Sequence, residues 1–322
     1  SPPVRFGQKY KKIFNGRNLD LFLNSSLVDF VKNDNKLQIG VFKSFSGNLL
    51  NIKSKAFVLA TGGIENSRLM LGLNKINNYR LFNKDMPIGK YWMEHPHFTI
   101  GESIIPTGWK DSFLALTGQK QEELGILNCG LRFYGNIGKR TLKKMIKDIS
   151  CYAPETGRKL FEMMERKLVC GSTIRAAWEQ APSKENKITL SDNKKDIFGI
   201  PRPVLHYKKS NFDKKTVYKT IKQVASYGNS KSYGKIRVFD YVSSLGEYPN
   251  NDELAGYHHM GGTRMSDSPV DGVVDRNLKV HGIDNFFIAG SSVFPSGGHA
   301  NPTLSITQLS LRLGDHIKNL LR

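Results

Sequence analysis

Two adjacent histidines and a downstream asparagine are the residues whose types and spacing could carry out acid–base chemistry. Residues 257–265 read YHHMGGTRM, and residues 298–306 read GHANPTLSI. An imidazole, with a reference pKa of about 6.5, can accept a proton near neutral pH. His258 and His259 are therefore candidate general bases, although spacing alone favours a structural role for a lone histidine.

The histidine pair does not predict a metal site. Adjacent residues on an extended segment point in opposite directions, so His258 and His259 would not meet at one ion. The sequence offers no HExxH motif, no partner histidine at helical spacing and no cysteine pair nearby. The three cysteines, Cys129, Cys151 and Cys170, are widely spaced and are interpreted as isolated, partly buried thiols.

Asn301 stands where a helix is expected to begin. Apolar residues after it recur at spacings of 3, 4, 4 and 3, which predicts a helix with one core-facing side. These residues are Ile306, Leu309, Leu313, Ile317 and Leu320. Asn301 suits the cap and Pro302 the first helical position. The free N–H groups of such a helix end favour a negative charge, which a reduced flavin, a phosphate or a carboxylate would supply.

Two short apolar runs predict buried strands that end in glycine. Residues 57–60 run into Thr61, Gly62 and Gly63, and a helical pattern starts at Ile64. A second run at 286–289 ends at Gly290. This pattern places backbone N–H groups at a sheet edge, where a ligand can approach closely. An ordinary turn between a strand and a helix would give the same pattern.

The remaining elements are predicted from β-favouring runs and helical periodicity. Residues 86–98 are interpreted as an ordered loop between two domains, and a middle region of different character follows. The predicted strands are 19–23, 26–32, 36–44, 48–53, 172–179 and 187–191, and the predicted helical stretches are near 138–168 and 211–227.

Composition excludes some classes of function. The 322 residues include 39% hydrophobic and 24% charged side chains, enough for one large domain or two interleaved ones, with no run long enough to span a membrane. The net charge of +20 comes without any nucleic-acid-binding motif, so no nucleic acid is expected as a partner. The basic stretch at 138–150 could rest on an anionic surface or a partner protein, but a solvated surface helix explains it equally well.

Five segments resemble the glucose–methanol–choline (GMC) oxidoreductase family in the order in which they occur. The resemblance covers the C-terminal two-thirds of such enzymes and is greatest to the branch of pyranose 2-oxidase and the fructose and gluconate dehydrogenase large subunits. The segments are FVLATGGIENSRLML, MPIGKYWMEHPHF, EQAPSKENKITLSDNKKDIFGIPRPVLHY, YHHMGGTRM and IAGSSVFPSGGHANPTLSI.

The resemblance implies a mixed α/β fold. It consists of part of a Rossmann-like FAD-binding domain with an inserted substrate domain built on an antiparallel sheet. Residues 1–98 would form the first FAD-binding segment, 99–250 the substrate-binding domain, and 251–322 the returning FAD-binding segment with the catalytic residues.

The family oxidises alcohols, and the resemblance implies the same reaction here. A hydride passes from the carbinol carbon to flavin N5, and a His–His or His–Asn pair handles the hydroxyl proton. His258 matches the family pattern Y-H-x-x-G, while a shifted reading, H-x-x-G-T, selects His259. Asn301 would be the partner, at 301 − 258 = 43 residues downstream, and His299 is an outer candidate. The implied substrate is a sugar, a polyol or another alcohol.

The resemblance also implies the contacts with FAD. Gly290 would act through its backbone, because many relatives have Asp at this position. The implied contacts are Leu27 with the adenine, Ala60, Thr61 and Gly62 with the dinucleotide, Gly290 and Ser291 with the pyrophosphate and ribityl chain, and Pro302 and Thr303 with the pyrimidine ring.

No GxGxxG motif occurs in these residues, although the family uses one to hold the pyrophosphate. We therefore expect an N-terminal portion of the enzyme to be missing, and the chain alone to bind FAD weakly or not at all. That portion and an electron-acceptor subunit are the expected partners besides the substrate. A non-catalytic subunit that keeps the fold without flavin is the alternative.

Overall fold

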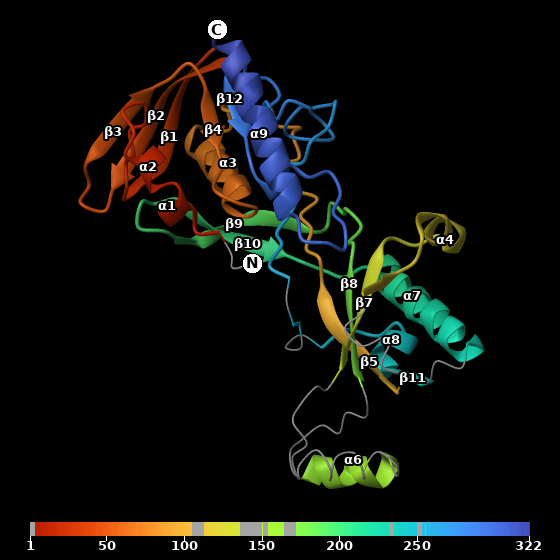
Figure 1. The fold of residues 1–322 in the computed structure, drawn as a ribbon. Helices are drawn as coiled ribbons and strands as arrows, with labels where there is room; N and C mark the ends of the chain where they lie inside the picture. Colours follow the sequence, from red (N-terminus) through yellow and green to blue (C-terminus); the bar gives the residue numbers. More distant parts are fainter. Residues whose placement is uncertain are drawn as a thin grey trace.

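The computed structural model describes residues 4–104, 113–135, 150, 154–163, 172–231, 235–249, 253–254 and 256–322. Its elements gather into two groups (Figure 1). One group combines the N-terminal strands, in red and orange, with the C-terminal helix, in blue. The other is built on an antiparallel sheet. The chain leaves the first group after Pro96, builds the second, and then returns to the first.

The first group contains α1 (Phe6–Lys9), α2 (Lys11–Phe14), β1 (Ser25–Asn33), β2 (Lys36–Ser44), β3 (Leu49–Lys53), β4 (Phe57–Leu59), α3 (Glu65–Ile76), β12 (Phe286–Ile288), η2 (Ser291–Val293) and α9 (Thr303–Leu320). The second contains β5 (His97–Ile104), β6 (Phe113–Ala115), α4 (Gly118–Leu124), β7 (Cys129–Gly135), β8 (Ser172–Trp178), α7 (Asn211–Ser230), β11 (Lys235–Val238) and α8 (Asp240–Ser243). The helix α6 (Pro154–Met163) stands apart from the sheet (Figure 1). A hairpin of β9 (Lys187–Lys195) and β10 (Pro201–His206) lies under the first group and packs on α3 (Figure 1).

β1, β2 and β3 form an antiparallel sheet in that order. The turn between β1 and β2 passes through Asp34, whose φ of 48° is one that Asp tolerates. The strands predicted at 26–32, 36–44 and 48–53 are confirmed. The strand predicted at 19–23 is wrong: these residues pair with no strand among the described residues. Their apolar side chains find no core, since Leu21, Phe22 and Leu23 are 54%, 56% and 71% exposed.

β4 and β12 pair in parallel, with Phe57 opposite Phe286 and Leu59 opposite Ile288. Both predicted strands are therefore confirmed. All three residues of β12 are buried, but β4 departs from the expectation because Val58 is 46% exposed. The Val58 side chain borders a cavity instead of a packed layer, and this explains its exposure.

The second group is a five-stranded antiparallel sheet of order β11-β5-β8-β7-β6. Alternate side chains of its central strands pack against α7, which begins at a capping box made by Ser210 and Asp213. The helix predicted at 211–227 and the strands predicted at 172–179 and 187–191 are confirmed. Cys129 lies in this core, where burial raises the pKa of its thiol to about 12 despite a hydrogen bond with Thr220 that lowers it.

α9 follows the predicted C-terminal stripe with two differences. Leu313 is buried, and Ile306, Leu309 and Ile317 pack on the core, but Leu320 is 55% exposed because the last turn extends past the core. Pro302, not Asn301, is the capping residue, and no side chain caps this end. None of the helices in the described ranges is long and apolar enough to cross a membrane.

Two features singled out in the sequence fall mainly on residues outside the described ranges. The basic stretch at 138–150 lies outside the described residues except for Ser150, as do Cys151 and Cys170.

Candidate active site

The carboxyl ends of β4 and β12 lie side by side and are joined by the fully buried side chain of Asn66. Its Oδ1 accepts the backbone N–H and the hydroxyl of Thr61 at 2.8 and 2.7 Å. Its Nδ2 donates to the carbonyl of Ala289 at 3.0 Å and to the hydroxyl of Ser292 at 2.8 Å. One amide at the start of α3 therefore fixes both strand ends.

Two glycines stand at these strand ends in a backbone conformation that favours glycine. The φ angles are +102° at Gly62 and +113° at Gly290. A Cβ at Gly62 would meet nothing within 4 Å, and one at Gly290 would meet only the Asn66 amide at 3.9 Å. The space in front of both backbones is open, so a ligand can approach closely at the carboxyl ends of these parallel strands.

A cavity of about 630 Å³ opens beside the strand ends. Its wall combines side chains from the first sheet, from β4, from α3 and from the β9–β10 hairpin, and most of them are apolar. Leu27, Ala60 and Thr61, three of the predicted FAD contacts, line it, together with Ser25, Ser26, Phe30, Phe42, Phe45, Phe57, Val58, Leu59, Glu65, Arg68, Leu69, Asp196, Ile197, Phe198, Ile200, Arg202 and Phe286.

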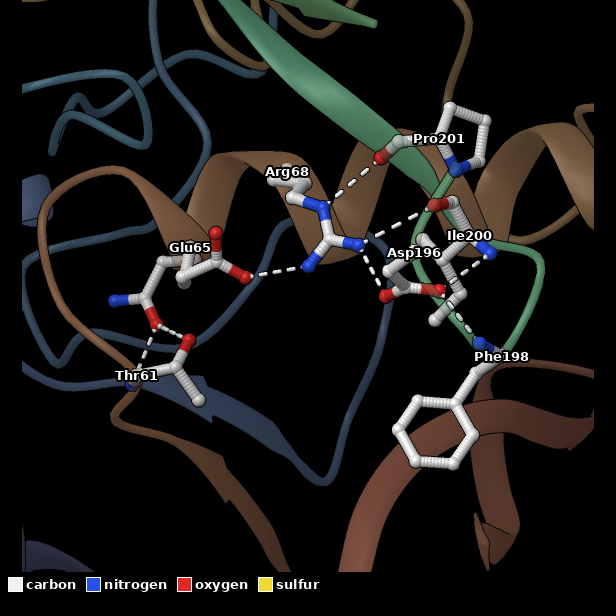
Figure 2. Close-up of polar contacts among 8 residues, drawn as sticks. Thr61, Glu65, Arg68, Asp196, Phe198, Ile200 and Pro201 are labelled. Carbon is white, nitrogen blue, oxygen red and sulfur yellow. Dashed lines mark hydrogen bonds and ion pairs between the residues drawn. The ribbon is translucent and has the colours of Figure 1, made fainter. Parts of the chain in front are cut away.

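Arg68 braces this wall (Figure 2). Its guanidinium donates to Glu65 at 2.7 Å, to Asp196 in the hairpin, and to the carbonyl of Pro201 at 2.9 Å. Burial raises the pKa of Asp196, but the hydrogen bonds from Arg68 and from backbone N–H groups outweigh that effect, and its pKa lies below the usual value. α3 and the hairpin are therefore held at a fixed separation across the cavity.

The histidine segment is tied to the end of β12. Three hydrogen bonds join residues 261–265 to 291–293, from Gly261 N–H to Ser291 at 3.1 Å, Thr263 to Ser292 at 3.0 Å and Met265 to Val293 at 2.8 Å. On its other side, Met260 exchanges backbone hydrogen bonds of 2.8 and 2.9 Å with Met93. Three segments far apart in the sequence thus meet at the strand ends.

Glu94 organises both histidines. This carboxylate is only 5% exposed, and its Oε1 accepts the backbone N–H of His95 at 2.9 Å and of His258 at 2.7 Å. Its Oε2 lies 3.6 Å from Nε2 of His259. The Glu94 side chain therefore fixes the backbone of one histidine and faces the ring of the next.

His258 and His259 point to different neighbours, as expected for adjacent residues on an extended segment. The His258 ring lies 4.5 Å from that of His95, and its Nδ1 is buried without a hydrogen-bond partner. The His259 ring lies 5.5 Å from Trp92. Burial lowers the pKa of His258, and the neighbouring His95 lowers it further, although Glu94 raises it. A neutral His258 can accept a proton.

Asn301, Pro302 and Thr303 lie at the open end of α9. Asn301 and Pro302 line a second cavity, of about 460 Å³, which Met260 also borders, two residues from His258. No hydrogen bond joins His258 to Asn301 among the contacts of these described residues. The catalytic pair of His258 and Asn301 thus stays a prediction. The first backbone N–H groups of α9, which lie beside Asn301, have no hydrogen-bond partner within the helix.

His299 brings this returning segment onto the antiparallel sheet. Its ring stacks on Phe113 of β6 with centroids 5.2 Å apart. A Cβ on Gly130 of β7 would lie 2.7 Å from the His299 ring, so glycine is required for this contact. Burial lowers the pKa of His299, and His95 contributes further to the shift. His299 therefore links the segment before α9 to strands β6 and β7 of the sheet.

Sequence reasoning missed Glu94, His95 and Asn66. All three occur inside quoted segments, MEHPHF and GGIENS, so their positions were visible, but their burial and their partners were not. No three His, Cys, Asp or Glu side chains of the described residues converge as metal ligands.

Part of the chain matches a known protein family. Residues 182–310 match the family model described as GMC oxidoreductase. This part of the chain is similar to the GMC oxidoreductase family. The family resemblance seen in the sequence is thereby confirmed, as is the mixed fold with an antiparallel sheet.

Two curated proteins are similar to most of this chain. The chain is 29% identical over 280 residues to the fructose dehydrogenase large subunit of Gluconobacter japonicus, covering 84% of this chain and 48% of that protein. It is 25% identical over 284 residues to 2-methyl-1,2-propanediol dehydrogenase of Mycolicibacterium austroafricanum, covering 83% of this chain and 48% of that protein. The chain spans about half the length of these two relatives.

Solved structures share its fold. A pyridoxine 4-oxidase from Mesorbium loti matches with a TM-score of 0.58 at 12% identity, over 92% of this chain and 57% of that one. An FAD-dependent oxidoreductase from Chaetomium thermophilum matches with a TM-score of 0.58 at 15% identity, over 97% of this chain and 64% of that one. At these identities the likeness concerns the fold alone.

Proposed function

We propose that this chain forms the substrate side and part of the cofactor side of an FAD-dependent enzyme that oxidises a CH–OH group of a sugar, polyol or other alcohol. The observation that carries the proposal is the hydrogen-bonded ladder between residues 261–265 and 291–293. It fixes the histidine segment directly beside two strand ends whose glycines leave room for a ligand.

The residues fit FAD in this position. Gly62 and Gly290 would approach the dinucleotide through their backbones, because no Cβ occupies the space in front of them. Leu27, Ala60 and Thr61 line an apolar cavity large enough for part of it, and Ser291, Pro302 and Thr303 complete the proposed contacts. FAD, when bound, supplies the acceptor for the hydride.

His258 is the proposed base. Its lowered pKa keeps the ring neutral at pH 7, and its backbone is fixed by Glu94. A base held in place in its neutral form removes the hydroxyl proton of the substrate as the carbinol carbon is oxidised. Asn301 is its proposed partner and orients the same hydroxyl. His259, which faces Glu94, is the second candidate for the base.

The names of the relatives support the reaction class. Fructose dehydrogenase and 2-methyl-1,2-propanediol dehydrogenase are named for a sugar and a diol. The first is also named as a large subunit, and on that ground we include an electron-acceptor subunit among the proposed partners.

The test is a visible absorption spectrum of the purified chain with FAD, recorded before and after anaerobic addition of sugars, polyols and simple alcohols. FAD fluorescence is titrated first, because weak binding is expected and the titration sets the concentrations needed. Bleaching of the bound flavin by at least one alcohol is the expected result. Saturable binding without bleaching by any of them would instead indicate a subunit that keeps the fold without catalysis.

A further inference from the structure

We propose that Arg132 and Arg175 form a subsite for an anionic group, and that the alcohol oxidised here carries a carboxylate or a phosphate. The subsite itself follows from the sheet. Assigning its occupant to the substrate rests on the proposed function.

The two arginines are direct cross-strand neighbours. In the antiparallel pairing of β7 and β8, Arg132 lies opposite Arg175. The same row of paired residues across the sheet includes Thr99 on β5, opposite Arg175, and Phe113 on β6, opposite Arg132. Side chains opposite each other in such a pair are about 5 Å apart at Cβ. Two guanidinium groups are therefore held together by the register of the sheet.

Both arginines lie on the face of the sheet away from α7. Their neighbours in sequence, Leu131 and Ile174, are fully buried in the core with α7, and successive strand residues point to opposite faces. Arg132 is exposed, and Arg175 is partly exposed. The pair is therefore accessible on the face that His299 contacts through Gly130.

Nothing in the described part of the chain neutralises this pair of charges. Within the described ranges neither arginine makes an ion pair with a carboxylate, and Nε of Arg175 is buried without a hydrogen-bond partner there. Both guanidinium groups lie over the ring of Tyr134, at 4.6 Å for Arg132 and 4.1 Å for Arg175. Like charges directly opposite each other are destabilising, and an anion bound between them removes that cost.

A carboxylate does lie on a neighbouring strand, but it serves another arginine. Glu102 of β5 is buried and pairs with Thr173 in the ladder, one row beyond Arg175. Its Oε2 is 3.7 Å from the guanidinium of Arg237 on β11. The Arg132–Arg175 pair therefore stays available to a ligand.

The pair lies one row of the sheet from His97, whose pKa responds both to the two arginines and to His258. His97 sits in the next row on this face, opposite Ala177, about 7 Å along the strand from the Thr99 row. Burial lowers the pKa of His97 to about 4, and the charges of His95, Arg175, Arg132 and His258 add to this shift. His97 thus stands between His258 and the arginines. A substrate with its hydroxyl at His258 and its anionic group at the arginines would therefore lie beside His97.

Guanidinium chemistry favours an oxyanion as the occupant. Arg presents paired N–H donors that match carboxylate and phosphate oxygens, and two such groups side by side can hold one anion from two directions. A neutral sugar would leave the two charges unpaired. The shared chemistry is an alcohol with an anionic group, either a sugar acid or a sugar phosphate.

The experiment is calorimetric binding to the purified chain, with and without FAD, using two matched pairs of probes. D-gluconate is compared with the uncharged D-glucitol, and D-glucose 6-phosphate with D-glucose. The chain is expected to bind at least one anionic probe at least tenfold more tightly than its neutral counterpart. Preference for gluconate identifies a carboxylate as the occupant, and preference for glucose 6-phosphate identifies a phosphate.

Variants separate this subsite from the general attraction of a basic protein for anions. Arg132→Gln and Arg175→Gln should each weaken binding of the preferred anion at least fivefold and leave the neutral counterpart unchanged. Arg237→Gln removes the same charge from the same sheet and should have little effect. Equal binding of charged and neutral probes, or equal losses in all three variants, would overturn the subsite.

The experiments distinguish failure of the proposed function from failure of the anionic subsite. Anion preference that depends on the arginines, with no flavin bleaching by any alcohol, would leave the subsite standing and remove the reaction. Bleaching of the flavin by neutral alcohols, with no preference for anionic probes, would support the proposed reaction and remove the subsite.

Discussion

The imidazole rings of His95 and His258 lie with their centroids 4.5 Å apart and their planes at 36°. Both ring nitrogens of His95 and Nδ1 of His258 are buried without hydrogen-bond partners. Protonation of His258 would place a positive charge in this dry contact, and this is why its pKa is lowered. The contact favours the neutral imidazole that a general base requires.

Replacing His95 should raise the pKa of His258. In His95→Phe the ring contact and most of the burial remain, but the charge of a second imidazole is removed. We expect the pKa of His258 to move up toward the ordinary value of about 6.5 without reaching it. Titration of the histidine ring signals by NMR measures this. His206 is an exposed histidine on β10, so His206→Phe is the control. An unchanged pKa would contradict the electrostatic part of the account.

Replacing Glu94 should act on His258 in the opposite direction. Glu94→Gln keeps an oxygen for the N–H groups of His95 and His258 but removes the negative charge that raises the pKa of His258. The pKa of His258 should therefore fall, and the acid limb of the flavin-reduction rate should move to lower pH. Reduction rates measured from pH 5 to pH 8 by rapid mixing would show this shift. A limb that stays in place would exclude His258 as the group that titrates.

FAD binding should depend on the bare backbone at Gly290. Gly290→Ala places a methyl group in the open space at the end of β12 and should raise the dissociation constant for FAD at least tenfold, which is about 1.4 kcal/mol.

Gly282→Ala is the matched control for that variant. Gly282 also has a positive φ, +76°, with nothing within 4 Å of a built Cβ. Both substitutions introduce backbone strain, and Gly290→Ala should lower the stability more, because its φ of 113° and ψ of −175° lie in a region that only glycine commonly adopts. Equal effects of the two variants in an FAD fluorescence titration would contradict the proposed contact.

The brace of Arg68 should contribute stability that depends on pH. The pKa of Asp196 is lowered in the folded chain, so its contribution is present above the unfolded pKa of about 3.9 and is lost as the pH falls through the folded value. Asp196→Asn should lower the unfolding free energy by about 1–2 kcal/mol at pH 7, or the Tm by roughly 2–8 °C.

The difference between Asp196→Asn and the parent should begin to shrink below about pH 4, where the carboxylate of the unfolded chain takes up a proton, and should disappear as the pH falls through the lower pKa of the folded chain. Thermal unfolding followed from pH 3 to pH 8 measures this. A difference that is constant over this range would argue against the ion pair as its source. Asp192 is an exposed carboxylate on β9, so Asp192→Asn serves as the control.

Periodicity predicted the longer helices α7 and α9 and strands such as β1, β2 and β8 because their patterns are local, whereas β5, β6, β7 and β11 were not predicted. β1, β2, β8 and α7 begin and end close to the expected residues. The run at 19–23 shows the limit of that reasoning, because its β-favouring residues have no neighbouring strand to pair with among the described residues. Val58 shows the same limit, since a cavity rather than a packed layer faces it.

The candidate site was predictable only where a motif marked it. The family resemblance singled out His258, His259, Gly290 and Asn301 as site residues. Glu94 lies 164 residues before His258, and the hydrogen bond between them appears only after folding. The arginine pair is likewise invisible in the sequence, because the register of β7 with β8 creates it. Long-range pairing, not local composition, decides which charges meet.

The most direct test of the central claim is the rate of flavin reduction by the best alcohol of the panel, measured anaerobically in the parent, His258→Ala and His259→Ala. Loss of a general base typically costs about 10²–10⁴ in rate. The account predicts a loss of that size in His258→Ala and a much smaller one in His259→Ala, with FAD affinity unchanged in both. A larger loss in His259→Ala would assign the base to His259, and unchanged rates in both variants would contradict the proposed chemistry.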